Sequence, residues 1–241
     1  MFPIYAGKPV TTAGTRNEST RNAWVERILK KIPPGSRLLD AGAGEKRFGL
    51  ACSHLVYVSQ DFSQYDGQGD GKGLQTGTWD QKCLDIVSDI TAIPEPDASF
   101  DVILCTEVFE HLPQPLLALR EFSRLLKPGG KLVLTAPFCS LTHFAPFHFY
   151  TGFSRYFYET LLPICGFEIL EREVNGNYFE YIAQELRRIP MVAEQYAGDR
   201  PGKLESFAMR VLLKMLERLS GEDTGSSDLL HFGSHVLAVK R

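Results

Sequence analysis

The stretch LLDAGAGEKRF, residues 38–48, decides the fold. Two leucines and an aspartate are followed by Gly42 and Gly44 and then by charged residues. An apolar run that ends in closely spaced glycines is typical of a buried strand that leads into a tight turn. Glycine lacks a Cβ atom, so the turn can adopt positive φ and a ligand can approach its backbone closely. We predict a strand, a ligand-holding turn and a helix over about residues 45–54.

Strand and helix patterns alternate on both sides of this turn. Apolar residues at three- and four-residue steps predict helices over 17–32 and 115–126. Short runs rich in β-branched and aromatic residues predict strands. They cover residues 36–42, 55–61, 84–90, the first part of 99–112, 131–138, 166–174 and 234–241. Because strands alternate with helices, the expected class is α/β, with a mostly parallel seven-stranded sheet covered by helices on both faces.

The rest of the chain predicts additions to this core. Residues 1–34 are expected to form a polar arm or lid and a helical cap, and residues 35–241 the main domain with a helical insertion at about 175–230. Within it, residues 204–219 carry an apolar stripe. The stripe comprises Leu204, Phe207, Ala208, Val211, Leu212, Met215, Leu216 and Leu219. We expect it to pack on the core or cover the active site, with a dimer contact or peripheral membrane contact as alternatives.

The amino-acid composition limits the classes of partner and the location that we expect for this protein. The net charge is −3 and the pI near 6.1, so no basic excess predicts nucleic-acid binding. The five cysteines are scattered without a CxxC pair, which favours reduced thiols in the cytoplasm and no metal site. The N-terminus lacks a signal-peptide pattern, and no apolar run reaches the length of a membrane span. The sequence leaves a monomer or a homodimer open.

A second acidic residue indicates what the turn holds. Asp61 follows the second predicted strand, and the carboxyl ends of neighbouring parallel strands meet at one edge of the sheet. A carboxylate there can accept hydrogen bonds from both hydroxyls of a ribose. A nicotinamide cofactor is the alternative, but Arg47 replaces the third glycine of its fingerprint and Glu45 would repel a pyrophosphate. We predict a ribonucleoside ligand.

Three further stretches carry a family resemblance. VSDI (87–90), EVFEHL (107–112) and LLKPGGKLVL (125–134), taken with LLDAGAG and Asp61, resemble the class I S-adenosylmethionine-dependent methyltransferases. The resemblance covers residues 17–174 and the last strand, and it departs from the family at Lys46, where many members have glycine. It implies a Rossmann-like sheet with an antiparallel last strand. It also implies S-adenosylmethionine as cofactor, S-adenosylhomocysteine as product, and a small-molecule, saccharide or lipid-linked acceptor. The alternatives are a non-catalytic S-adenosylmethionine-binding protein and a nicotinamide-dependent oxidoreductase.

The resemblance also implies residue roles. The methionine portion would be held by Asp40 and by the backbone of Ala41, Gly42, Ala43 and Gly44, the ribose by Asp61, and the adenosine by Phe62, Asp89 and Ile90. Cys105, Thr106 and Glu107 would line the floor near the sulfonium. The plainer alternative for Asp40 is a helix cap, and for Asp61 and Asp89 an ordinary turn aspartate.

Transfer from a sulfonium requires no metal, but a base assists an acceptor that carries a proton. The candidates are Glu107, His111, His143 and His148. The last two lie in a segment with eight aromatic residues between 144 and 158. We expect Phe153–Tyr158 to be mostly core and Phe144–Tyr150 to be mostly pocket or lid. This composition predicts an acceptor with an apolar or ring-shaped part.

Overall fold

The computed structural model describes residues 11–81 and 83–241 of the chain. It divides into two compact units. The sheet unit comprises Arg21–Glu173 and Gly233–Arg241, and the helical unit comprises the described residues 11–20 with Val174–Phe232. The expected insertion at 175–230 falls in the helical unit, together with the described end of the N-terminal arm.

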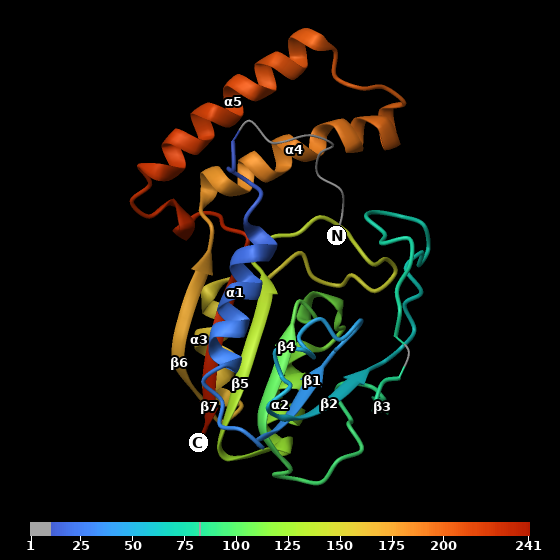
Figure 1. Cartoon of the computed structure of the whole chain (residues 1–241), viewed down its shortest axis with the longest axis vertical. Helices are drawn as coiled ribbons and strands as arrows, with labels where there is room; N and C mark the ends of the chain where they lie inside the picture. The colour runs from blue at the N-terminus through green and yellow to red at the C-terminus, as the bar shows by residue number, and fades with distance from the viewer. Residues whose placement is uncertain (1–10, 82) are drawn as a thin grey trace. The chain divides into compact units, whose positions relative to one another are not determined.

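A seven-stranded sheet forms the centre of the sheet unit (Figure 1). Its strands are β1 (Arg37–Ala41), β2 (Val56–Asp61), β3 (Ile86–Val87), β4 (Phe100–Thr106), β5 (Leu126–Pro137), β6 (Phe167–Asn175) and β7 (Gly233–Lys240). They lie in the order β3-β2-β1-β4-β5-β7-β6. The pairs from β3 to β5 are parallel and β7 runs antiparallel to β5, as predicted. The order reverses between β1 and β4, where ligands bind in such sheets.

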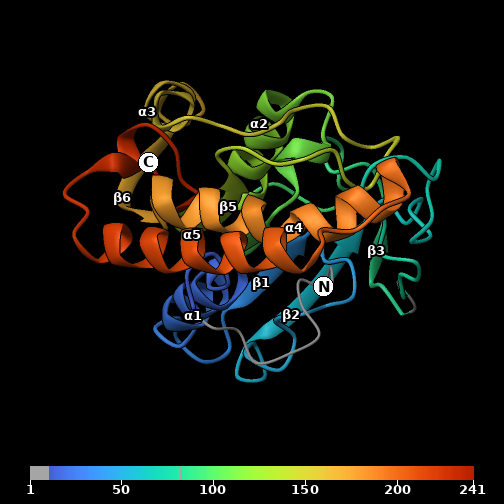
Figure 2. The same ribbon diagram turned by 90° about the horizontal axis from the view of Figure 1, so that it is seen from above.

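Helices cover both faces of the sheet. On one face α1 (Asn17–Leu29) packs Trp24 and Ile28 against strand residues such as Val102. On the other face lie α2 (Pro115–Leu125) and α3 (Arg155–Ile164), whose Phe122 and Leu162 belong to the larger apolar cluster. Figure 2 shows α1 on the side of the strands opposite to α2 and α3. These apolar contacts bury both faces of the central strands, which is why those strands read as continuous apolar runs.

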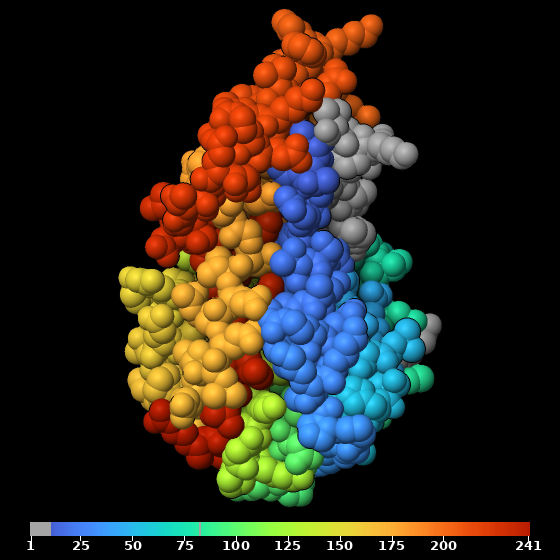
Figure 3. All heavy atoms as spheres, turned by 60° about the vertical axis from the view of Figure 1, so that its left-hand side comes forward, coloured from blue at the N-terminus to red at the C-terminus, as the bar shows by residue number. Residues whose placement is uncertain are grey.

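Ion pairs fix α1 along the sheet edge. Arg27 donates from Nη2 to Glu171 Oε1 at 2.7 Å and to Glu173 Oε1 at 2.5 Å, and the indole of Trp24 donates to Glu171 Oε1 at 2.8 Å. In Figure 3 the surface of this part of α1, in blue, lies beside that of β6, in light orange. The charged face of α1 is therefore bound to β6 while its apolar face covers the sheet.

Several predicted boundaries were wrong. The helix expected over 45–54 is a series of turns with mostly i to i−3 hydrogen bonds, such as Gly49 N to Lys46 O and Leu55 N to Cys52 O. The left-handed φ of +55° at Lys46 interrupts an α-helical path. The first helix ends at Leu29, β3 is reduced to two residues, and β5 starts at Leu126 because Leu126 pairs with Phe100 of β4, before an irregularity after which pairing resumes at Lys131.

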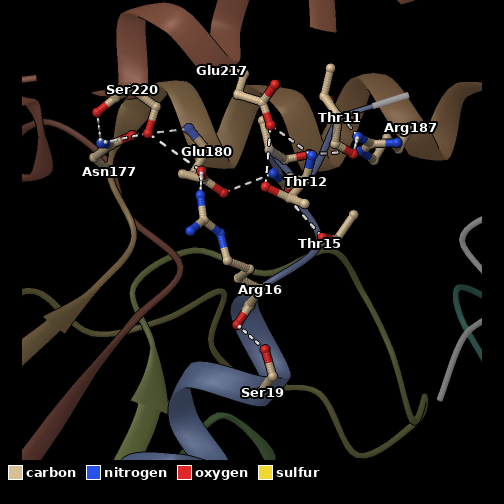
Figure 4. A network of polar contacts seen from close by, with 12 residues as sticks. Thr11, Thr12, Thr15, Arg16, Ser19, Asn177, Glu180, Arg187, Glu217 and Ser220 are labelled. Atoms are coloured by element: carbon tan, nitrogen blue, oxygen red, sulfur yellow. Dashed lines mark hydrogen bonds and ion pairs between the residues drawn. The ribbon is translucent and has the colours of Figure 1, made fainter. Parts of the chain in front are cut away.

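The helical unit contains α4 (Tyr178–Ala197), α5 (Lys203–Gly221) and a short helix, η2 (Ser226–Asp228). The described end of the N-terminal arm is bound to these helices (Figure 4). Arg187 of α4 donates to the carbonyls of Thr11 and Ala13 at 2.7 Å, Glu180 accepts from the amide of Gly14 at 2.8 Å, and Glu217 accepts from the amide of Thr12 at 2.7 Å. Residues 11–15 therefore form a strap across α4 and α5.

The apolar stripe of α5 lies mostly on the exposed side of the helix, so the expectation that it packs inward was wrong. The buried apolar residues of α5 are Leu213 and Leu216, which join Ala13 and Ala183 in a small cluster. Five stripe residues are exposed: Leu204, Phe207, Val211, Leu212 and Met215. No helix within the described residues is long and apolar enough to cross a membrane.

Candidate active site

The glycine turn follows β1 and is tightly enclosed. The amides of Gly42 and Ala43 donate to the carbonyl of Gln60 at 2.9 and 2.8 Å. Gly42 has φ +77°, and a Cβ atom there would lie 2.4 Å from Cγ2 of Val108. A Cβ atom on Gly44 would lie 2.6 Å from Cζ2 of Trp79. Both positions therefore require glycine, for conformation and for space.

Asp61 links the end of β2 to this turn. Its Oδ2 accepts from the amide of Gly44 at 3.0 Å, and its Oδ1 accepts from the amide of Ser63 at 3.0 Å and from Nε2 of Gln81 at 2.9 Å. The side chain is buried. Three donors hold the carboxylate in one orientation; Oδ1 already accepts two hydrogen bonds, and Oδ2 keeps one lone pair for a further donor. Phe62, the next residue, contacts Phe147 edge-on at 5.0 Å between ring centroids.

Asp40 is buried below the turn. The hydroxyl of Tyr57 donates to its Oδ2 at 2.5 Å. Burial raises the pKa of Asp40 to about 7, the nearby Asp61 raises it further, and the Tyr57 hydrogen bond opposes the rise. Because the residues after Asp40 form turns, it caps no regular helix. At neutral pH the carboxyl is therefore poised between its two protonation states.

The predicted adenine contacts lie at the end of β3. Asp89 is exposed, and its Oδ1 accepts from both the amide and the hydroxyl of Thr91 at 2.8 Å. These contacts within the turn are those expected if Asp89 is an ordinary turn aspartate, which is the alternative to an adenine contact. Ile90 is buried against the larger apolar cluster. The adenine roles of Asp89 and Ile90 stay predictions.

The residues at the end of β4 and directly after it differ in burial and in contacts. Cys105 is fully buried in the apolar core, while Thr106 is partly exposed. Glu107 adopts φ +55°; its Oε1 accepts from the hydroxyl of Thr135 at 3.0 Å, and its Oε2 pairs with Arg21 at 2.9 Å. Burial raises the pKa of Glu107, and Arg21 opposes the rise. Arg21 and Thr135 thus hold the side chain of Glu107 in place, and sequence reasoning missed the partner Arg21.

Three of the predicted histidines converge beside Glu107. His111 ends the short helix η1 (Phe109–His111), whereas His143 and His148 lie in the segment between β5 and α3. Ring centroids are 4.7 Å apart for His111 and His143, and 4.9 Å apart for His143 and His148. Sequence reasoning proposed these histidines separately and could not show that they meet.

Glu110 is a site residue that sequence reasoning missed. Its side chain is buried, and its Oε1 lies 3.7 Å from Nε2 of His111 and 3.7 Å from Nε2 of His143. Burial alone would raise the pKa of Glu110, but the two histidines outweigh it and lower the pKa. The stretch EVFEHL was noted for its family resemblance, but nothing in it marked Glu110 as buried, because glutamate side chains are usually exposed.

The histidines differ in protonation. Burial lowers the pKa of His111, with Glu110 opposing. Burial also acts to lower the pKa of His143, but Glu110 outweighs it and the net pKa is raised. Burial, reinforced by His143 and His111, lowers the pKa of His148 to about 4. His148 is therefore neutral at pH 7, while His143 is the most easily protonated ring of the three.

The glycine-rich loop after β2 pairs with the segment that carries His143. Leu74 donates to the carbonyl of Thr142 at 2.9 Å and accepts from the amide of Phe144 at 3.1 Å. Tyr65 stacks on Phe144 at 4.4 Å, and Trp79 contacts Phe144 edge-on at 5.1 Å. The described part of the loop thus forms an aromatic wall between the glycine turn and the histidines. The ring of Phe144 also stacks on His111 at 5.1 Å.

Comparison with known proteins identifies the family of this chain. Residues 15–195 match the family model described as "Methyltransferase domain". The chain belongs to the class I S-adenosylmethionine-dependent methyltransferases. It is therefore an enzyme that uses S-adenosylmethionine as methyl donor, which excludes the oxidoreductase and the non-catalytic binding protein.

Three similar proteins illustrate the range of this methyltransferase family. A demethylmenaquinone methyltransferase of Renibacterium salmoninarum is 33% identical over 79% of this chain and 76% of its own. A ubiquinone biosynthesis O-methyltransferase of Xanthomonas oryzae is 33% identical over 42% of this chain and 43% of its own, so this chain spans less than half of that relative. A solved methyltransferase of Archaeoglobus fulgidus aligns over 93% of this chain and 94% of its own, with TM-score 0.56 and 16% identity. That structure supports the fold alone.

Proposed function

We propose that this methyltransferase transfers the methyl group to a hydroxyl oxygen of a ring-containing small molecule. The observation that carries the proposal is the convergence of His111, His143 and His148 next to the aromatic wall. Rings such as Phe144 offer a flat apolar surface for an acceptor ring, and neutral imidazole can take a hydroxyl proton. The names of the two curated relatives, which refer to menaquinone and ubiquinone, point to the same kind of acceptor.

The cofactor would lie across the carboxyl ends of β1, β2 and β3. We assign the methionine portion to Asp40 and the backbone of residues 41–44, and the ribose hydroxyls to Asp61. The adenine would lie near Phe62, Asp89 and Ile90. Asp61 supports this placement best, because its carboxylate is already fixed by the Gly44 amide at 3.0 Å and faces the same turn. Such preorganisation reduces the free-energy cost of ordering the site when the nucleoside binds.

The protein's main task is then positioning. A sulfonium already carries an activated methyl group, so the acceptor oxygen, the methyl carbon and the sulfur must be held nearly in line, which can supply about 7–11 kcal/mol. His148 is the preferred proton acceptor, because it is neutral at pH 7 and neither ring nitrogen has a hydrogen-bond partner among the described residues. In His143, Nδ1 faces the carbonyl of Leu141 at 2.8 Å and Nε2 faces Glu110. His143 is therefore the less available of the two.

A methyl-transfer assay tests the acceptor class. The purified protein would be incubated with methyl-labelled S-adenosylmethionine and, separately, with catechol- and quinol-type phenols, a saccharide and a lipid-linked sugar. We expect label on a phenolic oxygen and at least 100-fold slower transfer in His148→Ala, whereas His54→Ala, which lies outside the cluster, should transfer at the wild-type rate. Labelling of the saccharide or the lipid-linked sugar instead of the phenols would contradict the proposal.

A further inference from the structure

The histidine cluster has the geometry of a metal site. One nitrogen each from His111, His143 and His148 lies within 4.8 Å of the other two. All three side chains are partly buried and belong to the sheet unit. Three imidazoles that approach each other this closely gain nothing from mutual contact between lone pairs, so a shared cation would explain why they converge.

Backbone carbonyls orient two of the three rings. Nδ1 of His111 lies 2.5 Å from the carbonyl of Phe147, and Nδ1 of His143 lies 2.8 Å from the carbonyl of Leu141. A carbonyl oxygen can only accept, so each Nδ1 must carry the hydrogen and each Nε2 keeps its lone pair in the neutral ring. Metal-binding histidines are oriented in this way by a second hydrogen bond to a carbonyl or carboxylate.

The third ring is free to complete the set. Both nitrogens of His148 are buried and lack a hydrogen-bond partner among the described residues. A buried polar group without a partner costs free energy, which a bound ion would recover. Because no hydrogen bond holds the ring, His148 can rotate to bring its nitrogen to the 2.0–2.1 Å that a zinc–nitrogen bond requires, a distance typical of such sites.

A buried carboxylate stands beside the three nitrogens. Oε1 of Glu110 is 3.7 Å from Nε2 of both His111 and His143, and its Oε2 has no hydrogen-bond partner among the residues described. The backbone carbonyl of Glu110 accepts from the amides of Phe149 and Tyr150 at 2.9 and 3.2 Å, which ties η1 to the segment that carries the other two histidines. The carboxylate supplies the negative charge and the oxygen atom that a fourth coordination position can use.

We propose that His111, His143 and His148 bind one divalent transition-metal ion of the zinc type, with Glu110 as the neighbouring anionic ligand. Three imidazoles and a carboxylate suit Zn²⁺ and Co²⁺ and are poor ligands for Mg²⁺ or Ca²⁺. The sequence predicted no metal site, since its cysteines form no CxxC pair and the three histidines lie in two separate segments. If the proposed acceptor is correct, a His148 nitrogen that binds the ion would no longer take the hydroxyl proton, and the ion would instead lower the pKa of an acceptor hydroxyl bound to it; that role alone rests on the proposed function.

Metal titration tests the site without an activity measurement. Protein stripped with a chelator would be titrated with Co²⁺, followed by visible absorption and by calorimetry, and Zn²⁺ bound after desalting would be measured by mass spectrometry. We expect one ion per chain, an absorption spectrum of nitrogen-coordinated cobalt and a rise in melting temperature with bound Zn²⁺. Less than a tenth of an ion per chain, with no spectrum, would overturn the proposal.

Substitutions of single histidines test whether the metal binds at this site rather than elsewhere on the protein, and whether metal binding is independent of methyl transfer. His148→Gln and His143→Gln should each weaken Co²⁺ binding at least tenfold, whereas His54→Gln should bind as the wild type does. Folding is checked by circular dichroism, and the cofactor site by calorimetry with S-adenosylhomocysteine, which should bind all variants. Equal Co²⁺ affinity in His148→Gln and His54→Gln would contradict the site. Metal binding without methylation of any phenol would leave the site standing and contradict the proposed acceptor.

Discussion

Asp61, at the end of β2, accepts a hydrogen bond from the amide of Gly44, in the turn after β1, at 3.0 Å. The contact joins the two features from which a nucleoside site was predicted. It fixes the carboxylate before any ligand binds, and it restrains a turn whose glycines are in left-handed conformations.

Gly42→Ala should destabilise the sheet unit by about 2–4 kcal/mol, because the new Cβ would lie 2.4 Å from Val108 at a positive φ. Gly71→Ala is the matched control: Gly71 has φ +75° and nothing within 4 Å of a Cβ atom, so only the backbone strain of about 1 kcal/mol should remain. Urea unfolding measures the free energy of unfolding of both variants. Adding Val108→Ala should recover part of the larger loss; equal losses in the two single variants would mean that the steric contact is unimportant.

Asp40→Asn should change the pH dependence of stability. The folded-state pKa of Asp40 is raised from 3.8 to about 7, so the folded protein binds more protons than the unfolded chain between these values. This carboxyl therefore stabilises the fold fully below about pH 4, and the contribution declines as pH rises to about 7. The free energy of unfolding of the wild type, relative to Asp40→Asn, should fall by up to about 4 kcal/mol across that window.

Melting curves of both proteins between pH 4 and pH 8 measure this difference. Asparagine can still accept from the hydroxyl of Tyr57, so the variant keeps the hydrogen bond and loses only the titration. A stability difference that is constant with pH would show that Asp40 has an ordinary pKa.

Arg187→Ala should destabilise the helical unit by about 2–4 kcal/mol. Arg187 is buried, and its guanidinium donates to the carbonyls of Thr11 and Ala13 in the strap, so truncation leaves buried carbonyls without their donor. Arg218→Ala removes an exposed pair with Glu222 and should cost less than about 0.5 kcal/mol. Thermal unfolding measures the loss of stability, and the rate of limited proteolysis near residue 12 reports whether the strap is released. Equal stability and equal proteolysis rates in Arg187→Ala and Arg218→Ala would argue against a structural strap.

Lys46→Gly should be more stable than Lys46→Ala by about 1 kcal/mol, because residue 46 has φ +55° and glycine adopts that conformation without strain. Both variants lose the hydrogen bond from Nζ to the carbonyl of Cys83, so the comparison isolates the backbone. Chemical unfolding gives the difference. Equal free energies of unfolding in the alanine and glycine variants would show that residue 46 does not adopt the left-handed conformation.

Local sequence patterns predicted the sheet well and its surroundings less well. Runs such as Leu38–Ala41 are buried on both faces, so their apolar character alone identifies a central strand. The segment after Lys46 carries helix-forming residues, but the turn that precedes it imposes left-handed backbone and the helix does not form. In α5 the apolar periodicity predicted a buried stripe, but of the stripe residues only Leu216 is buried, together with Leu213 outside the stripe.

The positions of the proposed cofactor residues in the fold were predictable because they lie at or after the ends of strands of the same sheet, while their roles stay predictions. The histidine cluster was not predictable. His143 reaches His111 because the segment after β5 pairs with Leu74 of the glycine-rich loop and because the amides of Phe149 and Tyr150 bind the carbonyl of Glu110. These are contacts between irregular segments far apart in the chain, and no periodicity encodes them.

Calorimetric titration of S-adenosylmethionine into the wild type and into Asp61→Ala tests the central claim, which is that the carboxylate fixed by Gly44 holds the nucleoside. We predict one site per chain in the wild type and at least 100-fold weaker binding in the variant, since the contact between the carboxylate and the ribose is lost. Asp97→Ala, which removes an exposed ion pair with Arg124, serves as the control and should bind normally. Unchanged affinity in a folded Asp61→Ala would contradict the account.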